Sequence, residues 1–126
     1  MSELTLEQMK ANRKLWVEAL RSGKYKQTKE ALKRKTGGMC CLGVLCDLAG
    51  VQWRDKADSE GKILPVETGS HVATDEAMAF VGLRRPSGMF RGDIDGQSDL
   101  AGLNDTGKRF KTIAKIIESE PPGLFI

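Results

Sequence analysis

The stretch GGMCCLGVLCDLAG, residues 37–50, decides how this chain folds. From residue 39 to residue 49 almost every side chain is small or apolar, and Asp47 carries the only charge. Such a run predicts a short helix buried on most sides, with Gly50 as its stop. Gly43 lowers helix stability by about 1 kcal/mol relative to alanine, so its presence indicates that another element packs closely there. We therefore expect this helix to lie at the centre of the core.

All three cysteines of the chain, Cys40, Cys41 and Cys46, lie in this stretch. A metal site would need a fourth ligand and paired spacings such as C-x-x-C, and the sequence has no such spacing. A nucleophilic thiolate at the start of the helix would need a base, and the single histidine, His71, is far along the chain. We favour the remaining interpretation, in which the thiols pack as small hydrophobes. An odd number of cysteines, two of them adjacent, also favours a reducing compartment.

The segment before this stretch divides into a helix and a basic region. TLEQMKANRKLWVEALRSG begins with a capping box and ends at a glycine, which predicts a helix with an inward stripe interrupted by Arg13. The inward residues of that stripe are Leu6, Met9, Trp16 and Leu20. Residues 24–38 suit either a helix from Thr28 to Lys35 or irregular, hairpin-like structure. We favour the irregular form because the charges leave little apolar face.

The segment after Gly50 predicts short elements separated by turns. Residues 51–73 indicate a small antiparallel element, and Thr74 caps a short helix that ends before Pro86. RRPSGMFRGDIDGQSD, residues 84–99, is dense in turn residues and predicts a mobile or ligand-facing loop. A helical turn at residues 100–103 and an amphipathic helix in KRFKTIAKIIESE complete the chain. The expected fold is α+β, a single domain over residues 1–126 with three to four helices packed on a short antiparallel sheet or hairpins.

The charges of the chain are unevenly distributed. The net charge is +3, yet residues 1–35 hold ten Lys or Arg against four Asp or Glu, and the rest of the chain is negative. Such a basic segment fits an anionic partner, or else a solvated face. The chain has no apolar run long enough to span a membrane and no export signal at its start, so we expect a cytoplasmic protein of a bacterial host with no membrane partner.

Two further segments resemble a phosphate-binding loop and a calcium-binding loop, but each lacks a residue that its motif requires. GLNDTGKR satisfies G-x-x-x-x-G-K, but Arg109 follows where a phosphate-binding loop needs Ser or Thr, and no apolar strand precedes it. A better explanation of this motif is that Asn104 or Asp105 caps a turn that leads into the last helix. The N-terminal amides of that helix could then also receive an anion. The aspartates of DIDGQSD do not match a calcium loop.

Three blocks of the chain together resemble a known family. The blocks are ALRSGKYKQ (residues 19–27), CCLGVLC (residues 40–46) and LNDTG (residues 103–107). Blocks of the form ALRSGxYxQ, CCLGVLC and LNDxG are typical of a widespread family of small proteins from bacteriophages and bacterial genomes. The resemblance implies a phage or prophage accessory protein and implies no activity, cofactor or metal.

Polar residues within these blocks are the candidate ligand-binding residues, since they are not obvious core. They are Arg21, Lys24, Tyr25, Gln27, Asn104 and Asp105. The sequence assigns no catalytic residue.

The leading functional hypothesis is a nonenzymatic protein that binds and blocks a host component, such as an anti-defence protein that binds an anionic ligand. That ligand would be a nucleotide signal, a nucleic acid or an acidic surface of a host protein, and self-association into a homo-oligomer is left open. The competing hypotheses are a small enzyme acting on a nucleotide or phosphorylated substrate, and a structural component of a virion.

Overall fold

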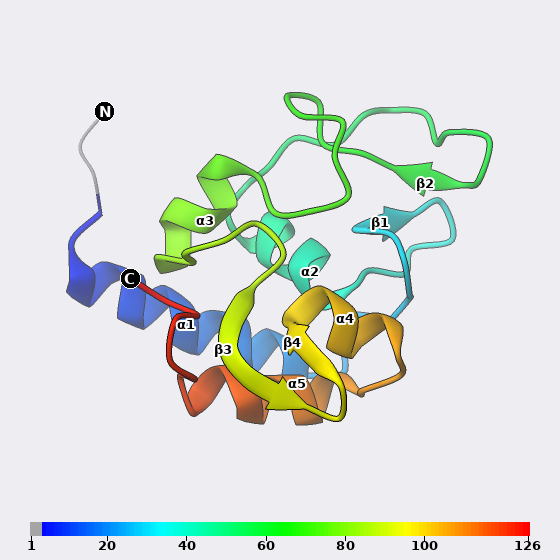
Figure 1. Cartoon of the computed structure of the whole chain (residues 1–126). Coiled ribbons are helices and arrows are strands. Elements are labelled where there is room, and N and C mark those ends of the chain that lie inside the picture. The colour runs from blue at the N-terminus through cyan, green and yellow to red at the C-terminus, as the bar shows by residue number, and fades with distance from the viewer. Residues whose placement is uncertain (1–3) are drawn as a thin grey trace.

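The computed structural model describes residues 4–126, which form five helices and two antiparallel two-stranded sheets. This arrangement confirms the α+β class (Figure 1). The helices are α1 (Leu6–Arg21), α2 (Cys41–Leu48), α3 (Asp75–Val81), α4 (Leu100–Asp105) and α5 (Phe110–Glu118). The strands are β1 (Lys33–Arg34), β2 (Lys62–Ile63), β3 (Met89–Ile94) and β4 (Gln97–Asp99).

Helix α2 is the centre of the core, as its composition predicts. Every residue from Cys41 to Cys46 is buried, and α1, α3 and α4 all pack against it. The indole Nε1 of Trp16 on α1 donates a hydrogen bond to the Cys41 carbonyl at 3.0 Å. Trp16 is completely buried, so it joins the first helix to the central one through apolar area and a hydrogen bond together.

Gly43 allows the backbone of Leu32 to cross α2 at close range. A Cβ atom at position 43 would lie 1.8 Å from the Leu32 carbonyl oxygen, far inside any tolerable contact. The same carbonyl accepts a hydrogen bond from the backbone N–H of Cys40. The expected close approach is therefore made by the segment that enters β1, and no side chain larger than hydrogen fits between the two backbones.

Helices α1 and α5 form the most extensive helix pair and lie side by side (Figure 1). The capping box at Thr5 and Gln8 is present, which confirms the predicted start of α1. The predicted inward stripe is only partly correct, because Leu6 is 52% exposed in the first turn. Arg13, which was expected to interrupt the stripe, is itself buried.

Arg13 is buried because it has specific partners on two other segments. Its Nε donates to the Val81 carbonyl at 2.6 Å, and its Nη1 pairs with Glu120 at 3.0 Å. The guanidinium carbon lies 4.0 Å from the centre of the Phe125 ring. Arg13 thus ties α1 to the end of α3 and to the segment that follows α5.

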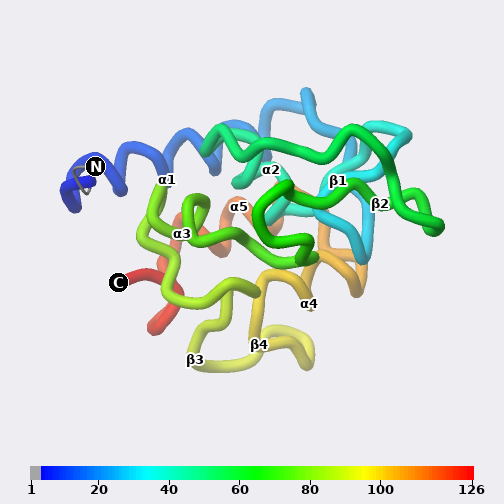
Figure 2. The backbone as a smooth tube through the Cα atoms, turned by 90° about the horizontal axis from the view of Figure 1, so that it is seen from above, coloured from blue at the N-terminus to red at the C-terminus, as the bar shows by residue number. Residues whose placement is uncertain are grey.

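The prediction of a loop at residues 84–99 is wrong, because most of this segment forms the β3–β4 hairpin. Asp95 and Gly96 both have positive φ, 51° and 84°, and they form a two-residue turn of the kind that matches the twist of a hairpin. Met89 pairs with Asp99 and Ile94 with Gln97, and β4 leads directly into α4. The two ribbons, β1–β2 and β3–β4, lie on different sides of the helical body (Figure 2).

The other short elements are closer to what the sequence predicts. Thr74 caps α3 and Gly82 ends it, as expected, and residues 24–38 are irregular apart from β1. In residues 51–73 the expected antiparallel element is reduced to β2 and to a bridge between Trp53 and Pro65. β2 pairs with β1, so its partner lies before α2 in the chain.

Replacing Gly43 with alanine should destabilise the fold strongly. The added methyl group would collide with the Leu32 carbonyl, and we expect a loss of about 3 kcal/mol, the upper end of the range for overpacking. Gly23→Ala is the matched control: its φ is +78° but no atom lies within 4 Å of the added Cβ, so it should cost about 1 kcal/mol. Urea unfolding of the two variants measures the difference, and equal losses would contradict the close approach.

Candidate functional site

The strongest charged feature of the molecule is the segment 24–35, here called the basic loop. It holds six cations and one carboxylate, which give it a net charge of +5 against +3 for the whole chain. None of the six cations lies within 4.0 Å of a carboxylate oxygen of residues 4–126, since the ion pairs found there involve Arg13, Arg21, Lys62 and Lys108. Four of the six are exposed, namely Lys24, Lys26, Lys29 and Lys35. The four exposed lysines of the basic loop therefore face solvent without a direct ion pair.

The side chain of Asn104 anchors the basic loop to the core. Asn104 is completely buried on α4. Its Oδ1 accepts hydrogen bonds from the Cys41 backbone N–H at 3.2 Å and from Gln27 Nε2 at 2.9 Å. Its Nδ2 donates to the Thr28 carbonyl at 2.7 Å. One amide thus connects the start of α2, the basic loop and α4, and both its ends are satisfied.

Gln27 extends this connection to α5. Its Nε2 also donates to the Lys108 carbonyl at 2.7 Å, and its Oε1 accepts from the Phe110 backbone N–H at 3.0 Å. Arg109, the residue at the N-cap position of α5, makes no capping bond with its own side chain. Gln27 therefore satisfies the start of α5 from a distant part of the chain, and the first amide of that helix is occupied.

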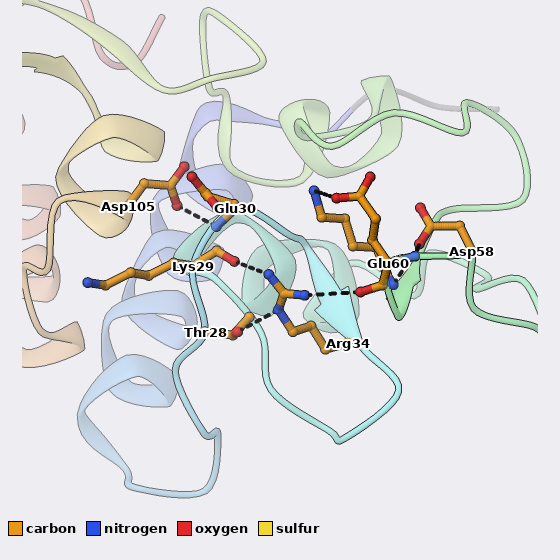
Figure 3. A network of polar contacts seen from close by, with 8 residues as sticks. Thr28, Lys29, Glu30, Arg34, Asp58, Glu60 and Asp105 are labelled. Atoms are coloured by element: carbon orange, nitrogen blue, oxygen red, sulfur yellow. Dashed lines mark hydrogen bonds and ion pairs between the residues drawn. The ribbon is translucent and has the colours of Figure 1, made fainter.

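Asp105 holds the middle of the basic loop. Its Oδ1 accepts a hydrogen bond from the Glu30 backbone N–H at 2.8 Å (Figure 3). Glu30 has a φ of 59°, a left-handed conformation that is costly for a residue with a side chain. Neither Asn104 nor Asp105 caps the last helix: the N-cap residue of α5 is Arg109, and Asn104 and Asp105 lie in α4 with their side chains bonded to the basic loop.

Arg34 secures the end of the basic loop with neutral partners. Its Nε donates to Thr28 Oγ1 at 2.9 Å and its Nη2 donates to the Lys29 carbonyl at 2.9 Å. Its Nη1 donates to the Glu60 carbonyl at 3.4 Å, so the guanidinium lies between the loop and the turn before β2 (Figure 3). Because these hydroxyl and carbonyl oxygens are uncharged, Arg34 forms hydrogen bonds but no ion pair.

Tyr25 fixes the beginning of the basic loop to α2. Its hydroxyl donates to Asp47 Oδ2 at 3.0 Å, and burial raises the pKa of Tyr25 above its usual value. Trp53 Nε1 donates to the other oxygen of Asp47 at 3.4 Å. Lys33 lies over the Trp53 ring with its Nζ 5.2 Å from the ring centre. The one charged residue of the central helix is therefore the acceptor for two aromatic side chains.

Arg21 lies in a different place from the other candidate residues. It forms a two-bond ion pair with Glu118, each bond 3.1 Å long, between the ends of α1 and α5. The pair borders a groove of about 360 Å³ between these helices, together with Lys10, Arg13 and Lys14. The structure thus brings Gln27, Asn104 and Asp105 together, and leaves Arg21 outside that group.

The three cysteines are buried in the core. Desolvation raises the pKa of Cys40 to about 12 and that of Cys46 to about 11, and it raises the pKa of Cys41 well above the usual range. Cys40 is the N-cap residue of α2, and its Sγ accepts from the Gly43 N–H. This burial supports packing as the role of the thiols. Residues 4–126 contain no group of three or more His, Cys, Asp or Glu side chains that could hold a metal ion.

Comparison with known proteins places the chain in a family. The profile of a domain of unknown function, DUF8296, matches residues 8–121. The chain belongs to the DUF8296 family. The match spans all three blocks identified in the sequence, and the basic loop with its anchors lies within it. No curated protein and no solved structure matches the chain. Within residues 4–126, no helix has the length and apolar character required to cross a membrane.

Sequence reasoning missed two of the residues that shape this region of the DUF8296 protein. Arg34 was counted only as one charge among many, and Asp47 only as an exception in an apolar run. The signal for Asp47 was available, since a lone carboxylate in a buried helix needs hydrogen-bond donors. Arg34 gives no comparable signal, because its partners are one threonine hydroxyl and two backbone carbonyls, which the sequence does not mark.

We expect Asn104→Ala to destabilise the fold by about 3 kcal/mol, because it removes the partners of the Cys41 N–H and the Thr28 carbonyl and one of the two acceptors of Gln27 Nε2. Asn12→Ala is the matched control, since Asn12 makes a single half-buried bond to the Phe80 carbonyl, and it should cost about 1 kcal/mol. Chemical denaturation measures both losses. Hydrogen exchange should also accelerate at Thr28 and Glu30 in the first variant, and unchanged protection there would contradict the anchoring role.

The native thiols should resist alkylation. At pH 8, iodoacetamide should modify the folded protein about a hundredfold or more slowly than the urea-unfolded chain, because burial suppresses the thiolate. The raised pKa of Cys40 also predicts how the stability of the fold changes with pH. The neutral thiol contributes fully to stability below its ordinary pKa of 9.0, and this contribution is lost as the pH rises towards about 12. Mass spectrometry counts the labels, and rapid native labelling of Cys40 would contradict its burial.

Proposed function

We propose that this protein is a nonenzymatic accessory protein that binds an anionic host component through the basic loop. The observation that carries the proposal is the combination of a net charge of +5 over residues 24–35 with an anchor buried in the core. A face that only keeps a protein soluble needs charge but no fixed backbone. The basic loop has both a high charge and a fixed backbone, and a preformed binding surface requires these two properties together.

The anchoring lowers the cost of binding. Tyr25, Gln27, Thr28, Glu30 and Arg34 each make a hydrogen bond to a residue outside the loop or across it. A partner therefore meets a backbone that is already ordered, and only the lysine side chains lose freedom on association. The uncancelled charge also attracts an anionic partner over a Debye length of about 8 Å at physiological salt.

Binding without chemistry suits the groups that the structure provides. The thiols, which are the strongest nucleophiles of the chain, are buried with raised pKa values. The side chains of Gln27, Asn104 and Asp105 are engaged in hydrogen bonds that hold the basic loop. We infer that these residues position the loop and that the exposed lysines contact the partner.

The setting we propose is that of a phage or prophage. The three sequence blocks resemble small proteins of bacteriophages and bacterial genomes, and proteins of this size commonly act by occupying a surface of a larger molecule. On this proposal the protein blocks a host component, such as one that serves in defence, by covering an anionic surface or ligand.

Charge reversal in the basic loop tests the proposal. The variant Lys24→Glu, Lys26→Glu, Lys29→Glu should lose retention on heparin, a generic polyanion, and elute at least about 0.2 M lower in salt, because it removes the attraction that drives binding. The variant should also lose any effect that the wild-type protein has on the growth or the phage sensitivity of a bacterial host.

The control changes the net charge equally at other exposed lysines. Lys56→Glu, Lys111→Glu, Lys115→Glu alters three exposed lysines outside the basic loop and should elute close to the wild-type protein. Equal losses in the two variants would show that net charge alone determines retention, and the proposal would then fail.

A further inference from the structure

We infer that the anion bound by the basic loop is the phosphodiester backbone of a nucleic-acid duplex, recognised without regard to base sequence. This inference rests on the proposed function and specifies its partner. It follows from three properties of the basic loop: it lines neither of two cavities of the molecule, its apolar side chains are buried, and its arginine and aromatic groups make contacts within the molecule.

A small nucleotide fits the basic loop poorly because the loop lines neither of the two cavities described here. The groove of about 360 Å³ is lined by residues of α1 and the end of α5, and a second cavity of about 300 Å³ is lined by residues 50–52, 65–67, 74 and 76. Small ligands bind in concave sites that enclose most of their surface. The four exposed lysines of the loop line neither cavity, and exposed cations of this kind suit an extended polyanion.

An acidic protein surface also fits poorly, because the basic loop offers no apolar anchor. Ala31 and Leu32 are buried, and Tyr25 is half-buried with its hydroxyl bound to Asp47. Protein interfaces are depleted in lysine and rely on buried aromatic and apolar anchors. Interfaces with nucleic acids are more polar and much more positive, and phosphate contacts by lysine supply most of their nonspecific affinity.

The hydrogen bonds of Arg34 argue against sequence-specific recognition of bases. Arginine reads guanine by presenting two N–H groups together to one base edge. In this protein the Nε, Nη1 and Nη2 atoms of Arg34 each donate to a partner within the molecule. Three of the five N–H groups of Arg34 are engaged and hold its guanidinium against the molecule, and the remaining five cations are lysines, which act as point charges towards phosphate.

The state of the aromatic residues favours a duplex over a single strand. Binding of single strands relies on aromatic rings that stack with exposed bases. Lys33 covers the ring of Trp53, and the hydroxyl of Tyr25 is bound to Asp47. Both rings are partly buried against the core, which leaves less of each ring for a base to stack on, whereas a duplex needs only the cations. The nearby carboxylates of Glu30, Asp58, Glu60 and Asp105 limit the footprint to a few phosphates.

The salt dependence of duplex binding tests this inference. Fluorescence anisotropy would follow the full chain binding a labelled 20-bp DNA duplex of arbitrary sequence between 50 and 200 mM NaCl. If the four exposed lysines each contact one phosphate, the slope of log Kobs against log[salt] should be about −3.6, and affinity should fall roughly a hundredfold over this range. Single variants Lys24→Ala, Lys26→Ala, Lys29→Ala and Lys35→Ala should each reduce the slope by about 0.9, and Lys111→Ala should leave it unchanged.

The outcomes separate this inference from the proposed function. A second duplex of unrelated sequence should bind equally well, and a tenfold preference for one sequence or for a single strand would overturn the inference. Binding of polyglutamate or heparin through the same lysines, without binding of the duplex, would overturn the inference and leave the proposed function intact. Failure to bind heparin, polyglutamate and duplex alike would overturn both.

Discussion

The amide of Asn104 is the contact on which the arrangement of this protein depends. It joins α4 to the basic loop and to the start of α2, and its partners lie 63 to 77 residues before it in the chain. An amide that is completely buried must have all its hydrogen bonds satisfied, or it would cost more than an apolar side chain. Each segment is therefore held in one position relative to the other two, and irregular structure becomes as fixed as a helix.

The parts of the fold that follow from local chemistry could be predicted from the sequence. The apolar run of α2, the capping box at Thr5 and the Thr74 cap depend on residues within one turn of each other. The β3–β4 hairpin was missed even though its turn carries an Asp-Gly pair. Only Phe90 of strand β3 is buried, so the alternating pattern that normally reveals a strand is almost absent.

The parts that depend on distant partners could not be predicted. Arg13 looked like an interruption of an apolar stripe because its partners, Val81 and Glu120, are more than sixty residues away. Gln27 and Asn104 were recognised as candidates, but nothing local shows that one bonds the other or that Gln27 satisfies the start of α5. In the structure the side chains of Gln27 and Asn104 hydrogen-bond each other and hold the basic loop against α4 and α5. A direct contact of any of them with a ligand stays a prediction.

Helices α1 and α5 pair with each other but are synthesised at different times, because they lie near opposite ends of the chain. About ninety residues separate the end of α1 from the start of α5. At ordinary translation rates this distance takes on the order of 10 s to synthesise. During that interval α1 has left the ribosome while its largest partner does not yet exist. The side of α1 that packs on α2 can be covered earlier, through Trp16, whereas the side that packs on α5 has no partner until the last helix has been made.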